Sequence, residues 1–168
     1  WNLNLWGEDL IATIRNGAIY YWDTSAGIGT RAVLASSIAG ADSVPNVVRV
    51  TTVSFPDRHF IAGGCQAYAA DGQGDVDDML IRWSTQEDFT KFAPTSLNTA
   101  GDQRLQVGTK IVTMVSAREE TIISTDEAIY GMTFVGAPFI FSFRLLATDA
   151  GAAGLNTMVT IDGNVFWI

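Results

Sequence analysis

A hairpin pattern recurs three times in this chain and constrains its fold more than any other feature. Each copy is an apolar strand, a short polar turn, and a strand in which an aliphatic residue precedes an aromatic one. The copies span Ile11–Trp22, Thr121–Met132 and Met158–Ile168. Two of the turns contain Asn16-Gly17 and Asp162-Gly163, dipeptides that accept positive φ and close tight hairpins. The pattern therefore predicts a repeated antiparallel β unit.

The spacing of this repeat predicts a propeller-like arrangement. Val165 follows Ile129 by 36 residues, and Ile129 follows Ile19 by 110, which is close to three further steps. Propeller blades of four strands recur at roughly 40–45 residues in regular families. A further hairpin fits the gap, with arms Val47–Phe55 and His59–Ala62. We therefore expect an all-β chain of propeller-like antiparallel blades, about three to four in number and irregularly spaced.

Composition agrees with a folded, β-rich chain. Of 168 residues, 48% are hydrophobic and only 17% charged, which excludes disorder, and sixteen glycines fit many turns. No apolar pattern at helical spacing is sustained. The chain starts at Trp1 and stops at Ile168 inside an apparent strand. We expect residues 1–168 to be a single segment, truncated at both ends, of a longer polypeptide, with another segment or chain covering its open sheet edges.

Local patterns place the remaining strands. Trp1–Trp6 alternates Trp1, Leu3 and Leu5 with asparagines, which suits a half-buried strand. Thr24–Val44 is rich in Ser, Ala and Gly and is expected to be a long connection with a short strand or turn at Arg31–Leu34. Pro94–Val107 is polar and extended, and Lys110–Val115 reads as the strand that leads into the hairpin at Thr121.

An acidic stretch is the sharpest local charge feature. Asp71, Asp75, Asp77 and Asp78 lie within eight residues that also contain two glycines. Calcium prefers such oxygen ligands, but the EF-hand order requires a glycine at the sixth position and a glutamate at the twelfth, and both are missing. We expect a solvated acidic tip between two strands, with a calcium site as the weaker alternative and no cofactor.

Few residues offer catalytic chemistry. His59 is the only histidine, and Cys65 is the only cysteine, so an internal disulfide is impossible and we expect a small buried thiol. The chain has no Gly-x-Ser-x-Gly or His-Glu-x-x-His motif, and Gly27-Ile28-Gly29 lacks the rest of a dinucleotide loop. No apolar run reaches the length of about 18 residues that a membrane span needs. We expect a protein that is not an enzyme.

Aromatic residues mark expected packing positions. Phe139, Phe141 and Phe143 alternate along one strand and form an apolar face that predicts a core or a subunit contact. The tryptophans at the corresponding places of the repeat are expected to be buried: Trp22, Trp83 and Trp167.

The same residues resemble a known family. The pattern is carried by Phe55–Gly63, by Leu80–Ser84 with Asp88-Phe89 and Phe92, by Ile122–Tyr130, and by Gly163–Trp167. It resembles the propeller region of short-tailed bacteriophage nozzle proteins, also called tail tubular protein B, with a related group called tail hub or stabilisation proteins. The resemblance covers roughly Val47–Ile168.

This resemblance implies a structural virion protein of the phage tail. Its propeller would belong to a sixfold nozzle ring, a homo-oligomer that docks on an adaptor and guides DNA out without sequence-specific binding. The net charge of −8 opposes tight binding of a polyanion but suits its passage. Proteins of this family are several-fold longer, so no gate or lumen residue is carried over.

Two other classes remain open. A carbohydrate-binding propeller of a tail or cell-surface protein would expose tryptophans that a soluble glycan could shield. A quinone-dependent propeller enzyme is suggested only by the turn Trp22–Gly27, which would have to recur in each blade and does not.

Overall fold

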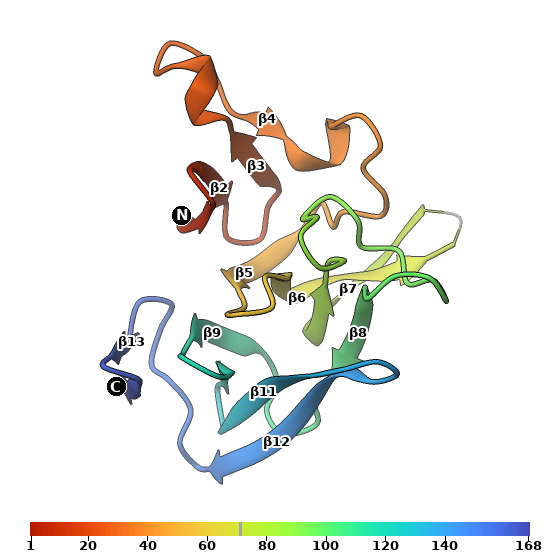
Figure 1. Cartoon of the computed structure of the whole chain (residues 1–168). Coiled ribbons are helices and arrows are strands. Elements are labelled where there is room, and N and C mark those ends of the chain that lie inside the picture. Colours follow the sequence, from red (N-terminus) through yellow and green to blue (C-terminus); the bar gives the residue numbers. More distant parts are fainter. Residues whose placement is uncertain (71) are drawn as a thin grey trace.

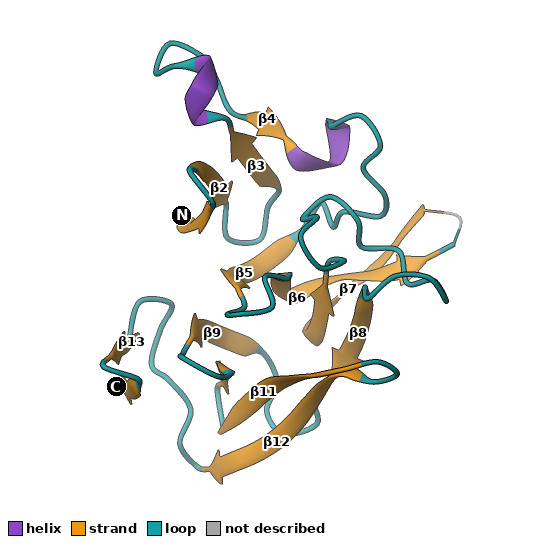
Figure 2. Cartoon of the chain, in the orientation of Figure 1, coloured by secondary structure: helices purple, strands orange, loops and turns teal. Residues whose placement is uncertain are grey.

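The computed structural model describes residues 1–70 and 72–168, and its regular secondary structure is almost entirely antiparallel strand (Figures 1 and 2). Three sheets have four strands each, connected in sequence order, and a fourth has two. This confirms the predicted all-β class. Within the described residues, no helix has the length and apolar character needed to cross a membrane.

The strands follow the chain sheet by sheet. The first sheet contains β1 (Asn2–Trp6), β2 (Asp9–Thr13), β3 (Ile19–Trp22) and β4 (Val33–Leu34). The second contains β5 (Val48–Val53), β6 (Phe60–Ala69), β7 (Gly72–Trp83) and β8 (Gly101–Arg104). The third contains β9 (Ile111–Ser116), β10 (Thr121–Thr125), β11 (Ala128–Gly136) and β12 (Ile140–Thr148). The fourth contains β13 (Met158–Ile161) and β14 (Asn164–Trp167).

The predicted connection after β3 is confirmed. It holds two short 3-10 turns, η1 (Thr24–Ala26) and η2 (Ala35–Ser37), on either side of the two-residue strand β4 (Figure 2). The Asp23 side chain accepts a hydrogen bond from the Ser25 backbone N–H at 2.8 Å and so caps the first of these turns.

The three recurring hairpins exist, but they do not occupy equivalent places. β2–β3 and β10–β11 are the central hairpins of four-stranded sheets, whereas β13–β14 forms a sheet alone. The first strands begin at Asn2, Val48, Ile111 and Met158, so the units start 46, 63 and 47 residues apart. The interval of 36 residues therefore joins strands that are not equivalent. The turns also differ, because Asp162-Gly163 closes a two-residue hairpin with positive φ at both residues, whereas Asn16 but not Gly17 has positive φ in the longer loop between β2 and β3.

The sheets are stacked in chain order, and apolar side chains fill the spaces between successive sheets (Figure 1). The first and second sheets enclose Trp6, Ile11, Ile19, Phe60, Phe89 and Phe92. The second and third enclose Ile61, Ile81, Trp83, Met114, Tyr130 and Phe141. The smaller space between the third sheet and β13–β14 holds Ile122, Ile129, Met158 and Val165. First strands contact one another through the whole series, β1 with β5, β5 with β9, and β9 with β13.

The exposed and inward-facing sides of β1 are the reverse of the sequence prediction. Trp1, Leu3 and Leu5 are exposed, and the asparagines face the second sheet. The reason is a polar partner on β5. Thr51 donates from its backbone N–H and its hydroxyl to Asn2 Oδ1, at 2.8 and 2.6 Å, and its hydroxyl accepts a hydrogen bond from Asn4 Nδ2 at 2.9 Å.

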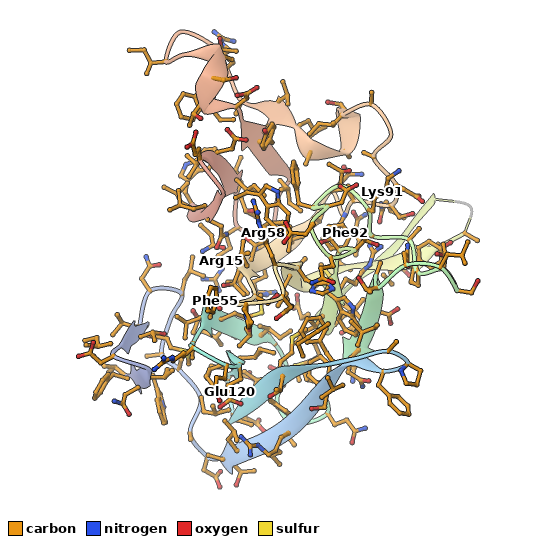
Figure 3. All side chains as sticks on the ribbon, viewed as in Figure 1. Arg15, Phe55, Arg58, Lys91, Phe92 and Glu120 are labelled. Atoms are coloured by element: carbon orange, nitrogen blue, oxygen red, sulfur yellow. The ribbon has the colours of Figure 1, made fainter. Side chains whose placement is uncertain are left out.

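Figure 3 shows Arg58, in the turn between β5 and β6, close to the first sheet. Its guanidinium lies 4.8 Å from the centre of the Trp6 ring and pairs with the Glu87 carboxylate at 3.1 Å. A cation over an aromatic face is attracted to the ring, so this contact helps to join the first two sheets.

Candidate functional site

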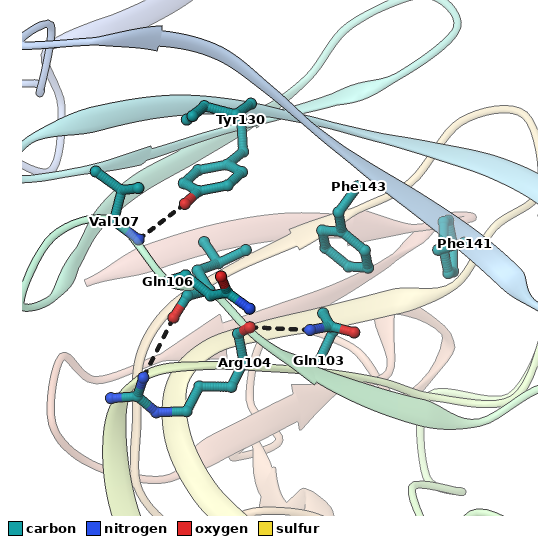
Figure 4. Close-up of a pocket in the computed structure, with 9 residues that line it drawn as sticks. Gln103, Arg104, Gln106, Val107, Tyr130, Phe141 and Phe143 are labelled. Atoms are coloured by element: carbon teal, nitrogen blue, oxygen red, sulfur yellow. Dashed lines mark hydrogen bonds between the residues drawn. The ribbon is translucent and has the colours of Figure 1, made fainter.

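A hollow lies between the second and third sheets. We call it the β8–β12 groove, a space of about 430 Å³ (Figure 4). Its lining combines polar and aromatic side chains, including Gln103, Arg104, Gln106, Tyr130, Phe141, Phe143 and Leu145. A groove of this size could hold a small ligand or one side chain of a partner.

Hydrogen bonds fix the polar wall of this groove. The Tyr130 hydroxyl accepts a hydrogen bond from the Val107 backbone N–H at 2.9 Å, and Gln103 Nε2 donates to the Arg104 carbonyl at 2.9 Å (Figure 4). Arg104 Nε lies 2.7 Å from an oxygen of Asp77. The carboxylate of Asp77 therefore balances the charge of the Arg104 guanidinium.

Aromatic side chains of β12 form the apolar part of the groove and the junction beneath it. Phe141 is buried edge-on against Trp83, with ring centroids 5.2 Å apart, and Phe143 is half-buried at 6.0 Å from the same ring. Phe139 departs from the prediction, because it is 78% exposed in the turn before β12. Ile140 has a φ of 60°, which breaks the strand alternation at this point.

The three tryptophans that were predicted to be buried differ in their exposure. Trp83 is buried, and its indole N–H donates to the Thr99 carbonyl at 2.8 Å. Trp22 is half-buried and donates to the Thr30 carbonyl at 3.0 Å. Trp167 is 44% exposed, which corrects the expectation that it is buried, because the two-stranded sheet that carries it covers too little surface.

The acidic stretch is strand rather than a solvated tip. Asp75, Asp77 and Asp78 lie in β7, while Asp71 lies outside the described residues. Asp78 pairs with Arg49, and Asp77 pairs with Arg104. Among the described residues, no three side chains with metal-binding groups converge, so the structure offers no support for the calcium alternative.

A buried polar network surrounds the single histidine. His59 Nδ1 lies 2.6 Å from Asp57 Oδ2, and the same carboxylate oxygen accepts a hydrogen bond from the Ser54 hydroxyl at 2.6 Å. On the other side of the ring, His59 Nε2 lies 3.0 Å from the Thr99 hydroxyl. Burial raises the pKa of Asp57, but the hydrogen bonds from His59 and Ser54 outweigh it, so the pKa lies below its usual range.

This order of carboxylate, imidazole and hydroxyl is the order found in hydrolytic triads. Its surroundings assign it another role. His59 is completely buried, and its ring lies 5.5 Å from Phe134 and 5.0 Å from Phe141, measured between centroids. The Thr99 hydroxyl also accepts a hydrogen bond from the Gln86 backbone N–H at 2.8 Å. The network holds two loops against the third sheet and satisfies groups that would otherwise be buried without partners.

Two other buried side chains, Cys65 and Arg82, have structural roles. Cys65 is buried in β6, as predicted, and burial raises the pKa of its thiol to about 12, so it is not a reactive thiolate. Arg82 is fully buried, and its guanidinium donates to the carbonyls of Gln66, Ser43 and Phe92 at 3.0, 2.9 and 3.2 Å. Arg82, in β7, therefore joins β6 to the loop before β5 and the loop after β7.

Sequence reasoning missed the network and the groove. The spacing Asp57-x-His59 within one turn was a sequence signal for the contact between these two side chains. Thr99 is 40 residues away in sequence from His59, and the groove combines β8 with β12, so neither follows from local pattern. No family model and no curated protein matches the chain.

Proposed function

We propose that this chain is a structural virion protein of a bacteriophage tail, a subunit of the nozzle or hub ring that forms the DNA ejection conduit. The proposal combines the sequence resemblance with one observation. The first strands β1, β5, β9 and β13 lie in series, each contacting the next, and in every four-stranded sheet the strands follow one another in chain order from the first strand. Propeller blades around an axis have this arrangement.

The distribution of basic groups supports a conduit. Arg49, Arg58, Arg104 and Arg144 are paired with carboxylates. Arg82 is buried and bound by carbonyls. Half of the ten basic side chains are thus occupied in a chain of net charge −8. Affinity for DNA depends on cations that neutralise phosphates, so the pairing of these arginines supports a conduit that would not hold DNA tightly.

Electron microscopy of native particles tests this proposal. We expect the stack of three four-stranded sheets to fit density at the end of a short tail, in a sixfold ring around a central channel and next to an adaptor. Particles that contain the chain without a ring or channel would contradict the proposal.

The alternative of carbohydrate binding has one observation in its favour, since Trp1 is 71% exposed and Trp167 is half-exposed. Aromatic faces at the surface can stack on sugar rings. A glycan panel with tryptophan fluorescence as the readout tests it: binding that Trp167→Ala removes would favour a receptor-binding protein, and unchanged emission with every glycan would exclude this alternative.

A further inference from the structure

The polar wall of the β8–β12 groove has hydrogen-bonding groups that the fold leaves unused. The Tyr130 hydroxyl accepts the Val107 N–H, and among the described residues no acceptor takes its own proton. Gln103 uses Nε2 toward the Arg104 carbonyl, which leaves its amide oxygen unbonded within the described part of the chain. The Gln106 amide, also in the lining, makes no hydrogen bond with a described residue. Donors and acceptors are therefore available side by side.

The facing wall of the groove is apolar. Phe143 and Leu145 are two positions apart on β12, so their side chains share one face of the strand. Phe143 is half-buried against Trp83, with ring centroids 6.0 Å apart, and Leu145 is 45% exposed. Figure 4 shows the Phe143 ring on the side of the groove across from Gln103. A ligand that fits must have one apolar face and polar groups along its edge.

The backbone of the polar wall is less available than its side chains. An added peptide strand would bond to free backbone groups of an edge strand. Here the Arg104 carbonyl already accepts a hydrogen bond from Gln103 Nε2 at 2.9 Å, and the Leu105 carbonyl accepts one from Arg104 Nη1 at 3.4 Å. A peptide that paired with these carbonyls would compete with the chain's own side chains. The groove therefore favours a ligand that side chains recognise.

We infer that the β8–β12 groove binds a neutral carbohydrate of one or two sugar units. Sugar hydroxyls both donate and accept hydrogen bonds, so they match the Tyr130 hydroxyl and the amides of Gln103 and Gln106. The C–H face of a sugar ring stacks on the Phe143 ring. The space of about 430 Å³ lies within the range of small-molecule sites.

The charges of the chain are the reason for a neutral sugar. Arg104 is the charged residue of the lining, and its guanidinium is paired with Asp77. The net charge of −8 repels acidic ligands on approach. Hydrogen bonds and ring stacking remain as the sources of affinity.

This site goes beyond the proposed conduit role, which needs no ligand. Its walls belong to the second and third sheets, in the middle of the chain. It is also separate from the exposed Trp1 and Trp167, the residues on which the alternative of a carbohydrate-binding propeller rests.

An NMR titration of the ¹⁵N-labelled chain tests the inference. The probes are galactose, maltose and diacetylchitobiose, which are neutral, and galacturonic acid as the acidic counterpart of galactose. We expect at least one neutral probe to bind with a Kd of about 1 mM, because the groove is open and offers few polar groups. The shifts should centre on the side-chain amides of Gln103 and Gln106 and on the indole N–H of Trp83, whose ring packs against Phe143.

Two variants locate the binding. Gln106→Ala removes an exposed amide, and Phe143→Leu removes the ring but keeps an apolar side chain. Each should weaken binding about fivefold, since each removes one contact with the ligand. Gln86→Ala is the matched control, because Gln86 is an exposed glutamine outside the lining, and it should bind like wild type. The backbone amide spectrum of each variant reports its folding in the same experiment.

Four results would overturn the inference. The first is the absence of shifts with every neutral probe up to about 10 mM, well above the expected Kd. The second is unchanged affinity in folded Gln106→Ala and Phe143→Leu. The third is a set of shifts centred on the indole signals of Trp1 and Trp167, and the fourth is tighter binding of galacturonic acid than of galactose. Failure of the nozzle proposal would come instead from microscopy of particles and would leave a measured groove site intact.

Discussion

The two large junctions of the stack are built differently around the same strand. β5 contacts β1 on one side and β9 on the other. Toward β1, Thr51 makes hydrogen bonds with both asparagines of the neighbouring strand, and its hydroxyl lies 3.1 Å from that of Thr13. Toward β9, Val50 belongs to an apolar cluster with Met114 and Ile111. The strand contact of β5 with β1 is thus made by directional polar bonds and its contact with β9 by apolar packing, although an apolar cluster also fills the space between the first two sheets.

The difference shows how adjacent residues of one strand can determine two interfaces. Val50 and Thr51 are neighbours, and alternation sends them to opposite faces. Hydrogen bonds fix the register of the first sheet on the second, because each needs a particular partner. Apolar packing fixes the third sheet by filling volume, which tolerates no missing or charged side chain. The two junctions should therefore fail under different substitutions.

The largest expected effect is in the apolar junction. Phe141 is buried between Trp83, His59 and Phe134. Phe141→Asp removes a buried ring and introduces a charge without a partner, so we expect a loss of about 4 kcal/mol or more in the free energy of unfolding. Urea denaturation measures it, and this loss is a large fraction of the roughly 5–15 kcal/mol that stabilises a typical domain.

Phe139→Asp is the matched control for that substitution. The residue type is the same and lies two positions earlier, but the side chain is exposed. We expect a change within about 0.5 kcal/mol. Equal unfolding curves for Phe141→Asp and wild type would show that the junction does not depend on this ring.

The same contrast explains how much of the fold could be predicted from sequence. Strand positions and hairpins were predictable, because alternation and Asn-Gly or Asp-Gly turns are local signals. Which face of β1 is buried was not predictable from sequence. The usual preference for buried leucine is overridden by the hydrogen bond between Asn4 and Thr51, which lie 47 residues apart. Local alternation also fails at Phe139, where the positive φ of Ile140 shifts the face.

The candidate site was less predictable than the fold. Asp77 and Asp78 attract attention as a cluster, but each finds an arginine from another strand, so their role depends on pairing that sequence spacing does not reveal. The β8–β12 groove and the contact of His59 with Thr99 likewise join separate strands and loops. Features that depend on which strands become neighbours require the fold to be known first.

An intermediate effect is expected where the apolar junction contains a polar network. Asp57→Asn removes the charge that His59 and Ser54 stabilise, while it keeps nearly the same shape. We expect a loss of about 2 kcal/mol at neutral pH, because hydrogen bonds to a charged group are stronger than neutral ones. Asp149→Asn is the control, because Asp149 is exposed and its left-handed backbone also suits asparagine.

The pH dependence of this variant has a definite sign. The pKa of Asp57 is lower in the folded chain than its usual value of 3.8, so the ionised carboxylate stabilises the fold above that value. The stabilisation is lost as pH falls through the lower folded pKa. The difference in unfolding free energy between wild type and Asp57→Asn should therefore shrink below about pH 3.8. A difference that stays constant down to pH 2 would show that the charge of Asp57 contributes nothing.

The smallest effect should come from exchanging the polar and apolar side chains at the neighbouring positions Val50 and Thr51 of β5. Thr51→Val keeps the shape but removes the hydroxyl that bonds Asn2 and Asn4, and we expect a loss of about 1 kcal/mol. A double-mutant cycle with Asn4→Ala measures this polar contact directly, and strict additivity would contradict it. The reciprocal Val50→Thr places a hydroxyl among apolar side chains and should cost at least as much. If instead both substitutions were neutral, the two faces of β5 would be interchangeable, and the polar and apolar junctions would differ in appearance but not in what holds the sheets together.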